Sequence, residues 1–185
     1  MSSEVTPFQN LQHQRIDWKI TETGFFVIKS FVYPTGLSFT EYTSHTKIGS
    51  WPLVNITLGR NPETGRLKTA KGVIAIGRIA FGFLPIGQLA IGVLPFGQLS
   101  LGLILALGQG AFSLGAAVGQ VAVAPVFAAG QIAVAYAAIG QICLGWYCIA
   151  QFAVGVHLWT TKVKDPAALE FFKNLLPFLK QINFG

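Results

Sequence analysis

The sequence predicts a mainly β protein: a hydrophobic β-solenoid with a small β-rich cap before it and an amphipathic helix after it. A ten-residue repeat runs from Gly77 to Trp159, and it is rich in Ile, Val, Leu and Phe. No Asp or Glu occurs between Gly72 and Lys164, whereas residues 1–71 have an ordinary mixed composition. A ten-residue step turns an α-helix by about 280°, so helix packing gives no reason for this period. Short strands stacked on themselves do give one.

The first expected segment, residues 1–71, is a polar, basic, β-rich N-terminal cap. The runs WKITETGFFVIKSFVYP, LSFTEYTS and PLVNITLG have the β-branched and aromatic content of short strands. NPETG lies between PLVNITLG and RLKTAKG and predicts a hairpin turn. The amino-terminal residues have no apolar core of the kind found in signal peptides, so no cleavable signal is expected.

The second expected segment, residues 72–160, is the solenoid itself. Each block is two pentads, as in GQLAI and GVLPF, and three central blocks carry an eleventh residue that a one-residue bulge would accommodate. Glycine is expected at the corners, for positive φ or close backbone approach, at Gly77, Gly82, Gly87, Gly92, Gly97, Gly102, Gly130, Gly140 and Gly145. Glutamine fills the second position of seven of the eight blocks, and stacking predicts a side-chain amide ladder of Gln88, Gln98, Gln109, Gln120, Gln131, Gln141 and Gln151.

A helical alternative remains open for the array. The eleven-residue spacing from Gln98 to Gln131 would keep Gln on one helix face. The apolar length, about 88 residues, would also supply three or four membrane helices. The number of pentads in one solenoid turn is likewise open.

The third expected segment, residues 161–185, is an amphipathic helical cap. Asp165 is a suitable N-cap, Pro166 fits the first helical position, and Pro177 should end or bend the helix. The net charge of +6 lies in the segments that flank the array. Basic side chains beside an apolar segment suit an anionic lipid surface, and the candidates are Lys68, Lys71, Lys162 and Lys164. No nucleic-acid motif accompanies them, so nucleic acid is not an expected partner.

The pentads resemble the pentapeptide-repeat family, with Gly in the small position and a central apolar residue at Ile79, Leu84, Leu89, Leu94 and Leu99. They also look like Gly-rich AIG-repeat proteins of bacteria. The resemblance implies a right-handed, four-sided β-helix. That family is polar outside, whereas the expected outward residues here are Ala, Pro, Ile, Phe and Val, so its acidic, DNA-mimicking activity does not carry over.

The expected function is a non-enzymatic, architectural one in or against a membrane. We expect Leu89 and Leu99 to point inward and Ile91 and Phe96 outward, which leaves an apolar wall that a soluble monomer seldom tolerates. Lipid, or further copies in a homo-oligomer, would cover it, at the bacterial inner membrane or its cytoplasmic face. The alternatives are a self-assembling filament or scaffold protein and an α-helical channel or transporter.

No catalytic constellation is evident. The array holds Ser100, Ser113 and His157 without a carboxylate to orient a base, so His157 is expected to be a packed or interfacial side chain. Cys143 and Cys148 follow the repeat spacing and are expected to be small apolar fillers. We therefore expect no enzyme activity, cofactor, metal or small-molecule substrate.

Overall fold

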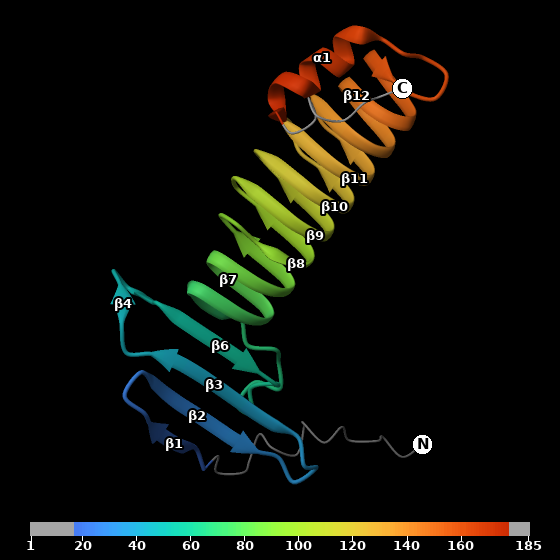
Figure 1. Cartoon of the computed structure of the whole chain (residues 1–185). Coiled ribbons are helices and arrows are strands. Elements are labelled where there is room, and N and C mark those ends of the chain that lie inside the picture. The colour runs from blue at the N-terminus through green and yellow to red at the C-terminus, as the bar shows by residue number, and fades with distance from the viewer. Residues whose placement is uncertain (1–16, 178–185) are drawn as a thin grey trace, which may run out of the picture. The chain divides into compact units, whose positions relative to one another are not determined.

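The computed structural model describes residues 17–177, which belong to two compact units divided between Gly97 and Gln98. Both units consist mainly of β-strands (Figure 1). The division falls inside the repeat array, and the three-segment organisation stays a prediction.

The first unit begins with an antiparallel meander. Four strands pair in the order of the chain, namely β1 (Lys19–Glu22), β2 (Phe26–Val32), β3 (Ser38–Ser44) and β6 (Val54–Leu58). Two short strands, β4 (Lys47–Ile48) and β5 (Trp51–Pro52), pair with each other and lie between β3 and β6 in the sequence. Tyr33 and Phe39 are buried, and T-shaped ring contacts join Tyr33 to Phe31 and Phe39 to Trp18. The expected NPETG turn is confirmed, since Gly65 N–H donates to Asn61 O at 2.8 Å.

The solenoid begins where β6 pairs in parallel with β7 (Ala70–Gly92). β7 is 23 residues long because its hydrogen bonding continues around the corners as the chain coils. Gly82 lies against the carbonyl oxygen of Gly72, and Gly92 lies against that of Gly82. Successive turns are therefore ten residues apart, which corresponds to two pentads per turn. The next strand, β8 (Phe96–Gly102), crosses the division between the units.

The second unit continues as parallel strands in strict register. They are β9 (Leu105–Ser113), β10 (Ala116–Val123), β11 (Phe127–Val134) and β12 (Ala137–Trp159). Ala117 pairs with Ala106 and Ala128, each eleven residues away, and Ala128 pairs with Ala138, ten residues away. The predicted β-solenoid and its extra residue in the eleven-residue blocks are confirmed, and the helical alternative for the array is wrong. Two pentads make a turn, not the four that a four-sided helix would need.

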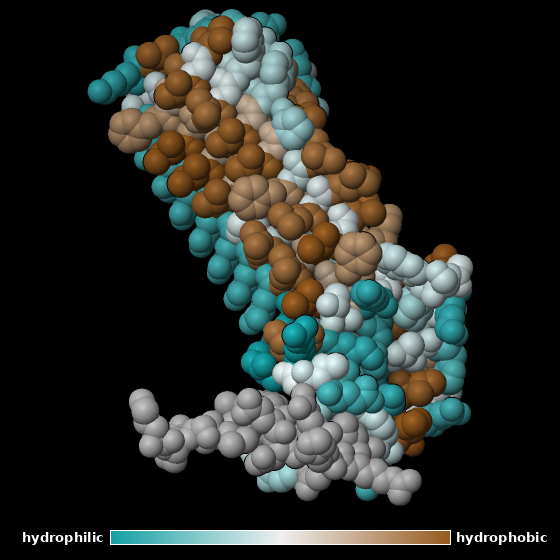
Figure 2. Space-filling model, turned by 180° about the vertical axis from the view of Figure 1, so that it is seen from behind, coloured by the Kyte–Doolittle hydropathy of each residue, from teal (hydrophilic) through white to brown (hydrophobic). Residues whose placement is uncertain are grey.

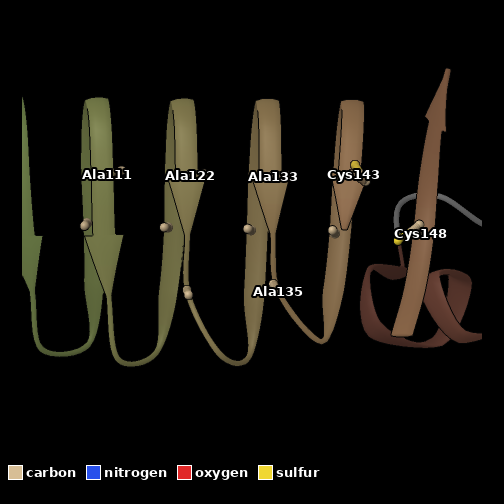
Figure 3. Close-up of a cluster of buried hydrophobic side chains, with 11 residues drawn as sticks. Ala111, Ala122, Ala133, Ala135, Cys143 and Cys148 are labelled. Atoms are coloured by element: carbon tan, nitrogen blue, oxygen red, sulfur yellow. The ribbon is translucent and has the colours of Figure 1, made fainter. Parts of the chain in front are cut away.

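Small side chains fill the interior of the turns. Figure 3 shows them in a row, with Ala111, Ala122, Ala133 and Cys143 on successive turns. All four are at most 2% exposed, as are the residues of a second set in the same cluster, Ala106, Ala117, Ala128, Ala138 and Cys148. In the first unit the same places hold Ala70, Ala75, Ala80, Pro85, Ala90 and Pro95, which are also buried. The core of each pentad is thus one small residue.

The expected inward placement of the central leucines is wrong. Leu99 is 41% exposed and Leu89 is half-buried, whereas the Ala and Pro residues expected outside point inward. A turn of ten or eleven residues brings its two strands too close for branched side chains between them. Phe96 does lie outside, as expected, and Ile91 is half-buried.

The repeat glycines are required by close approach and not by backbone conformation. Within residues 17–177 the glycines with positive φ are Gly36, Gly49, Gly59 and Gly65, all before the array. A Cβ on Gly130 would overlap the carbonyl oxygen of Gly119, one turn earlier. Positive φ and close backbone approach were the two expected reasons for these glycines, and the structure supports close backbone approach.

The second unit ends in the expected helix, α1 (Pro166–Leu175). The Asp165 side chain accepts a hydrogen bond from Ala167 N–H at 2.9 Å, and Pro166 occupies the first turn. Phe172 is fully buried against β12 and packs beside Ala137. The predicted N-cap and helix end are confirmed.

Candidate functional site

The most extensive feature with functional potential is the outer surface of the turns. Since Ala and Cys occupy the interior, the large apolar side chains point away from it. In the second unit the exposed ones, between 37% and 68%, are Leu99, Leu101, Leu103, Ile104, Phe112, Leu114, Val118, Val121, Val126, Ile132, Tyr136, Ile142, Leu144, Trp146, Phe152, Val154 and Val156. Figure 2 shows hydrophobic residues, in brown, over much of the surface of the turns. In the first unit Phe81, Phe83 and Ile86 are exposed in the same way.

One polar row interrupts this surface. Gln98, Gln109, Gln120, Gln131, Gln141 and Gln151 of the second unit are all exposed, as is Gln88 of the first. Gly108, Gly119, Gly130 and Gly140, each directly before a glutamine, are paired in register, so the glutamines align too. Among the hydrogen bonds of residues 17–177, none joins two of these side chains. Their alignment is a finding, and the amide ladder stays a prediction.

The basic residues expected at a lipid surface differ in their surroundings. Lys68 forms an ion pair with Glu41 at 2.7 Å, so part of its charge is neutralised. Lys71 and Lys162 have exposed side chains, and Lys164 lies 5.7 Å from the centre of the Trp159 ring. Lys68 and Lys71 belong to the first unit and the other two to the second, so each pair is placed only within its own unit.

A polar network surrounds the Lys68–Glu41 pair in the first unit. Asn55 is 5% exposed, and its amide nitrogen donates to Thr43 Oγ1 at 3.0 Å, while its oxygen accepts from Lys71 N–H at 3.1 Å. Asn55 belongs to β6, so these bonds connect β6 to β3 on one side and to β7 on the other. Asn55 is the first residue of an Asn-Ile-Thr sequence, and its side chain is therefore buried and hydrogen-bonded within the sheet.

A His–carboxylate pair that the sequence did not predict lies at the end of the array. Nδ1 of His157 lies 2.8 Å from Oδ2 of Asp165, and the imidazole stacks on Tyr147, which stacks in turn on Phe171 of α1. Hydrogen bonds from His157 and from Ala167 N–H hold the pKa of Asp165 below its ordinary value of 3.8. Asp165 was recognised only as an N-cap, and no motif connects it to a histidine eight residues away. The pair joins the helix to the last turn.

The remaining chemistry-bearing side chains of the array lie inside the turns. Ser100 is fully buried and donates to Leu107 O at 2.6 Å, and Ser113 accepts from Gly115 N–H at 3.1 Å. Cys143 and Cys148 are buried free thiols at places that hold Ala in neighbouring turns. Within the described residues, no three His, Cys, Asp or Glu side chains gather to hold a metal ion. None of the helices in residues 17–177 is both long and apolar enough to cross a membrane.

Comparison with known proteins returned no match among family models, curated proteins or solved structures. The apolar outer surface of the turns is therefore the feature from which a function can be proposed.

Proposed function

We propose that this protein is a non-enzymatic membrane protein whose solenoid turns lie in or against a lipid bilayer, where it has an architectural role. The observation that carries the proposal is the outward apolar surface. Soluble monomers rarely expose apolar patches larger than a few hundred Å². Here seventeen large apolar side chains on the turns of the second unit are exposed, and the interior has no room for them.

Transfer to lipid offers a clear gain for these side chains. Full burial of a Val, Leu, Ile or Phe side chain is worth about 1.5–3 kcal/mol, so a half-exposed one gains about 1 kcal/mol. Ile132, Ile142 and Phe152, which follow the glutamines in three successive blocks, are 42%, 53% and 67% exposed. These side chains contribute little to the core, and their transfer into an apolar environment would be favourable.

The backbone of the turns is also compatible with hydrocarbon. A chain in lipid must satisfy its own backbone N–H and C=O groups. β9, β10, β11 and β12 do so through parallel pairing from turn to turn. The exposed Lys162 and the ring-stacked Lys164 lie just beyond the last turn, where a headgroup region would favour them.

Liposome flotation, combined with tryptophan quenching, tests the proposal. A variant that keeps only Trp146, which is 50% exposed, should float with liposomes, and lipids brominated in their acyl chains should quench it strongly. The matched control keeps only Trp18, which packs on Phe31 and Phe39 in the meander and should be quenched weakly. Protein that stays monodisperse in water without detergent and does not float would contradict a membrane role.

Self-assembly through the same apolar surface is the second candidate, because the exposed side chains repeat at every turn and could pack wall to wall. It predicts polymer that sediments and persists in detergent. Lipid embedding predicts particles of small, defined size in detergent.

A further inference from the structure

The glutamine row is a regular polar feature on a surface that is otherwise apolar. In the second unit it places one exposed amide on each turn. On one side the row is bordered by Val121, Ile132 and Ile142, and on the other by Val118 and Ile139. Figure 2 shows a line of hydrophilic residues beside the brown surface. Such a row has no role in packing the core.

The amides of this row have unused hydrogen-bonding capacity. A Gln side chain carries two N–H donors and an oxygen with two lone pairs. Among the hydrogen bonds of residues 98–177, none involves these side chains. Even a complete ladder along the row would use one donor and one lone pair per residue. One donor and one lone pair would still point away from the turn, where hydrocarbon offers no partner.

A second copy of the same row is the partner that fits. Each amide is both donor and acceptor, so the row is self-complementary, as a two-fold symmetric contact requires. The amides are uncharged, so they offer no ion pair to a charged ligand. Their regular spacing, one per turn, is matched by a second copy with the same repeat. Polar side chains that bond across segments are a general means of association in membranes.

We propose that two copies of this chain associate in the bilayer through the row formed by Gln98, Gln109, Gln120, Gln131, Gln141 and Gln151, which bond to one another across the contact. This inference rests on the proposed membrane role and adds to it the surface of association. The apolar columns on either side of the row close around it and exclude lipid.

Cross-linking in proteoliposomes tests the contact directly. Cys143→Ala and Cys148→Ala first remove the native thiols. Gln131→Cys in this background should give a dimer with a short bismaleimide. Val126→Cys, at a 61% exposed position off the row, is the matched control and should stay monomeric. Equal cross-linking at the two positions would overturn the proposal.

A second measurement uses energy transfer between labelled copies as lipid is added. Bonds between membrane segments are worth about a factor of three each, so replacing Gln120, Gln131 and Gln141 with Leu should weaken association about 20-fold. The matched control, Val121, Ile132 and Ile142 replaced with Leu, changes the neighbouring column and should associate like the wild type. Unchanged association of the Gln variant would refute the contact.

Flotation of the same samples separates the two proposals. If the wild type floats as a monomer, the glutamine contact is wrong and the membrane role stands. If the wild type does not float, the membrane role is wrong, and cross-linking of Gln131→Cys in water then decides the contact by itself.

Discussion

Replacing Gly130 with Ala adds a single carbon atom, Cβ, where two successive turns of the solenoid are in contact, and so tests how closely the turns stack. A Cβ at this position would overlap the carbonyl oxygen of Gly119 in β10, so β10 and β11 would have to separate locally. β11 is held between β10 and β12 and cannot simply shift away. Ala150 has this place in the last block, after which no further turn of the array follows within the described residues.

The expected loss follows from the backbone hydrogen bonds near this contact. Separation breaks or lengthens about two of them and leaves their groups buried without partners, at about 1–3 kcal/mol each. The reduced entropy of the unfolded Ala variant offsets about 0.4–1 kcal/mol. We expect Gly130→Ala to lower the free energy of unfolding by about 2–4 kcal/mol.

Gly110→Ala is the matched control. The closest atom that a Cβ there would meet is Cδ1 of Leu99, at 3.2 Å, and a rotamer change would relieve that contact. The next two, Cε2 of Phe112 at 3.7 Å and the carbonyl oxygen of Gln98 at 3.8 Å, are at ordinary van der Waals distances. Its effect should lie within about 1 kcal/mol of the wild type. The assay is guanidinium unfolding in detergent, followed by the β signal in circular dichroism. If the two variants unfold within about 1 kcal/mol of each other, the stacking argument fails.

Three further predictions concern the core and the helical cap. Ala133→Leu should destabilise the fold by about 1–3 kcal/mol or more, because the interior has no space for a larger side chain. Ile132→Ala, on the outer face, should change the unfolding midpoint in detergent much less. The reverse order would contradict the assignment of the inner and outer faces. The double replacement of Cys143 and Cys148 with Ala should leave the melting temperature nearly unchanged, and in the wild type both thiols should react with a maleimide only after denaturation; rapid labelling of native protein would contradict their burial. The pKa of Asp165 in the folded state lies below its ordinary value of 3.8. Its contribution to holding α1 should therefore be fully present above about pH 3.8 and should be lost as the pH falls through the folded-state pKa. Hydrogen exchange of the α1 amides should report this loss, and Asp165→Asn, which keeps an N-cap without the charge, should remove the pH dependence.

Repetition made much of the fold predictable. The ten-residue period, the pentads and the eleven-residue blocks were sufficient to predict stacked strands, and Asp165 with Pro166 was sufficient to predict the start of α1. The His157–Asp165 pair was not predictable, because it depends on where the loop after Trp159 returns. The apolar outer surface was predicted in kind, and Phe96 lies on it as expected, but the prediction for the central leucines and the alanines was wrong, since Leu99 lies outside and Ala90 inside.

The sequence by itself determined that identical positions stack, that they form strands, and that the surface around them is apolar apart from one row of amides. Only the tertiary structure decided which face of each strand points inward. Alternate residues on a strand face opposite ways, and in this array both sets are apolar, so hydropathy cannot distinguish them. Volume does: a turn of two pentads admits Ala, Pro, Ser or Cys between its strands and leaves Ile, Leu and Phe outside.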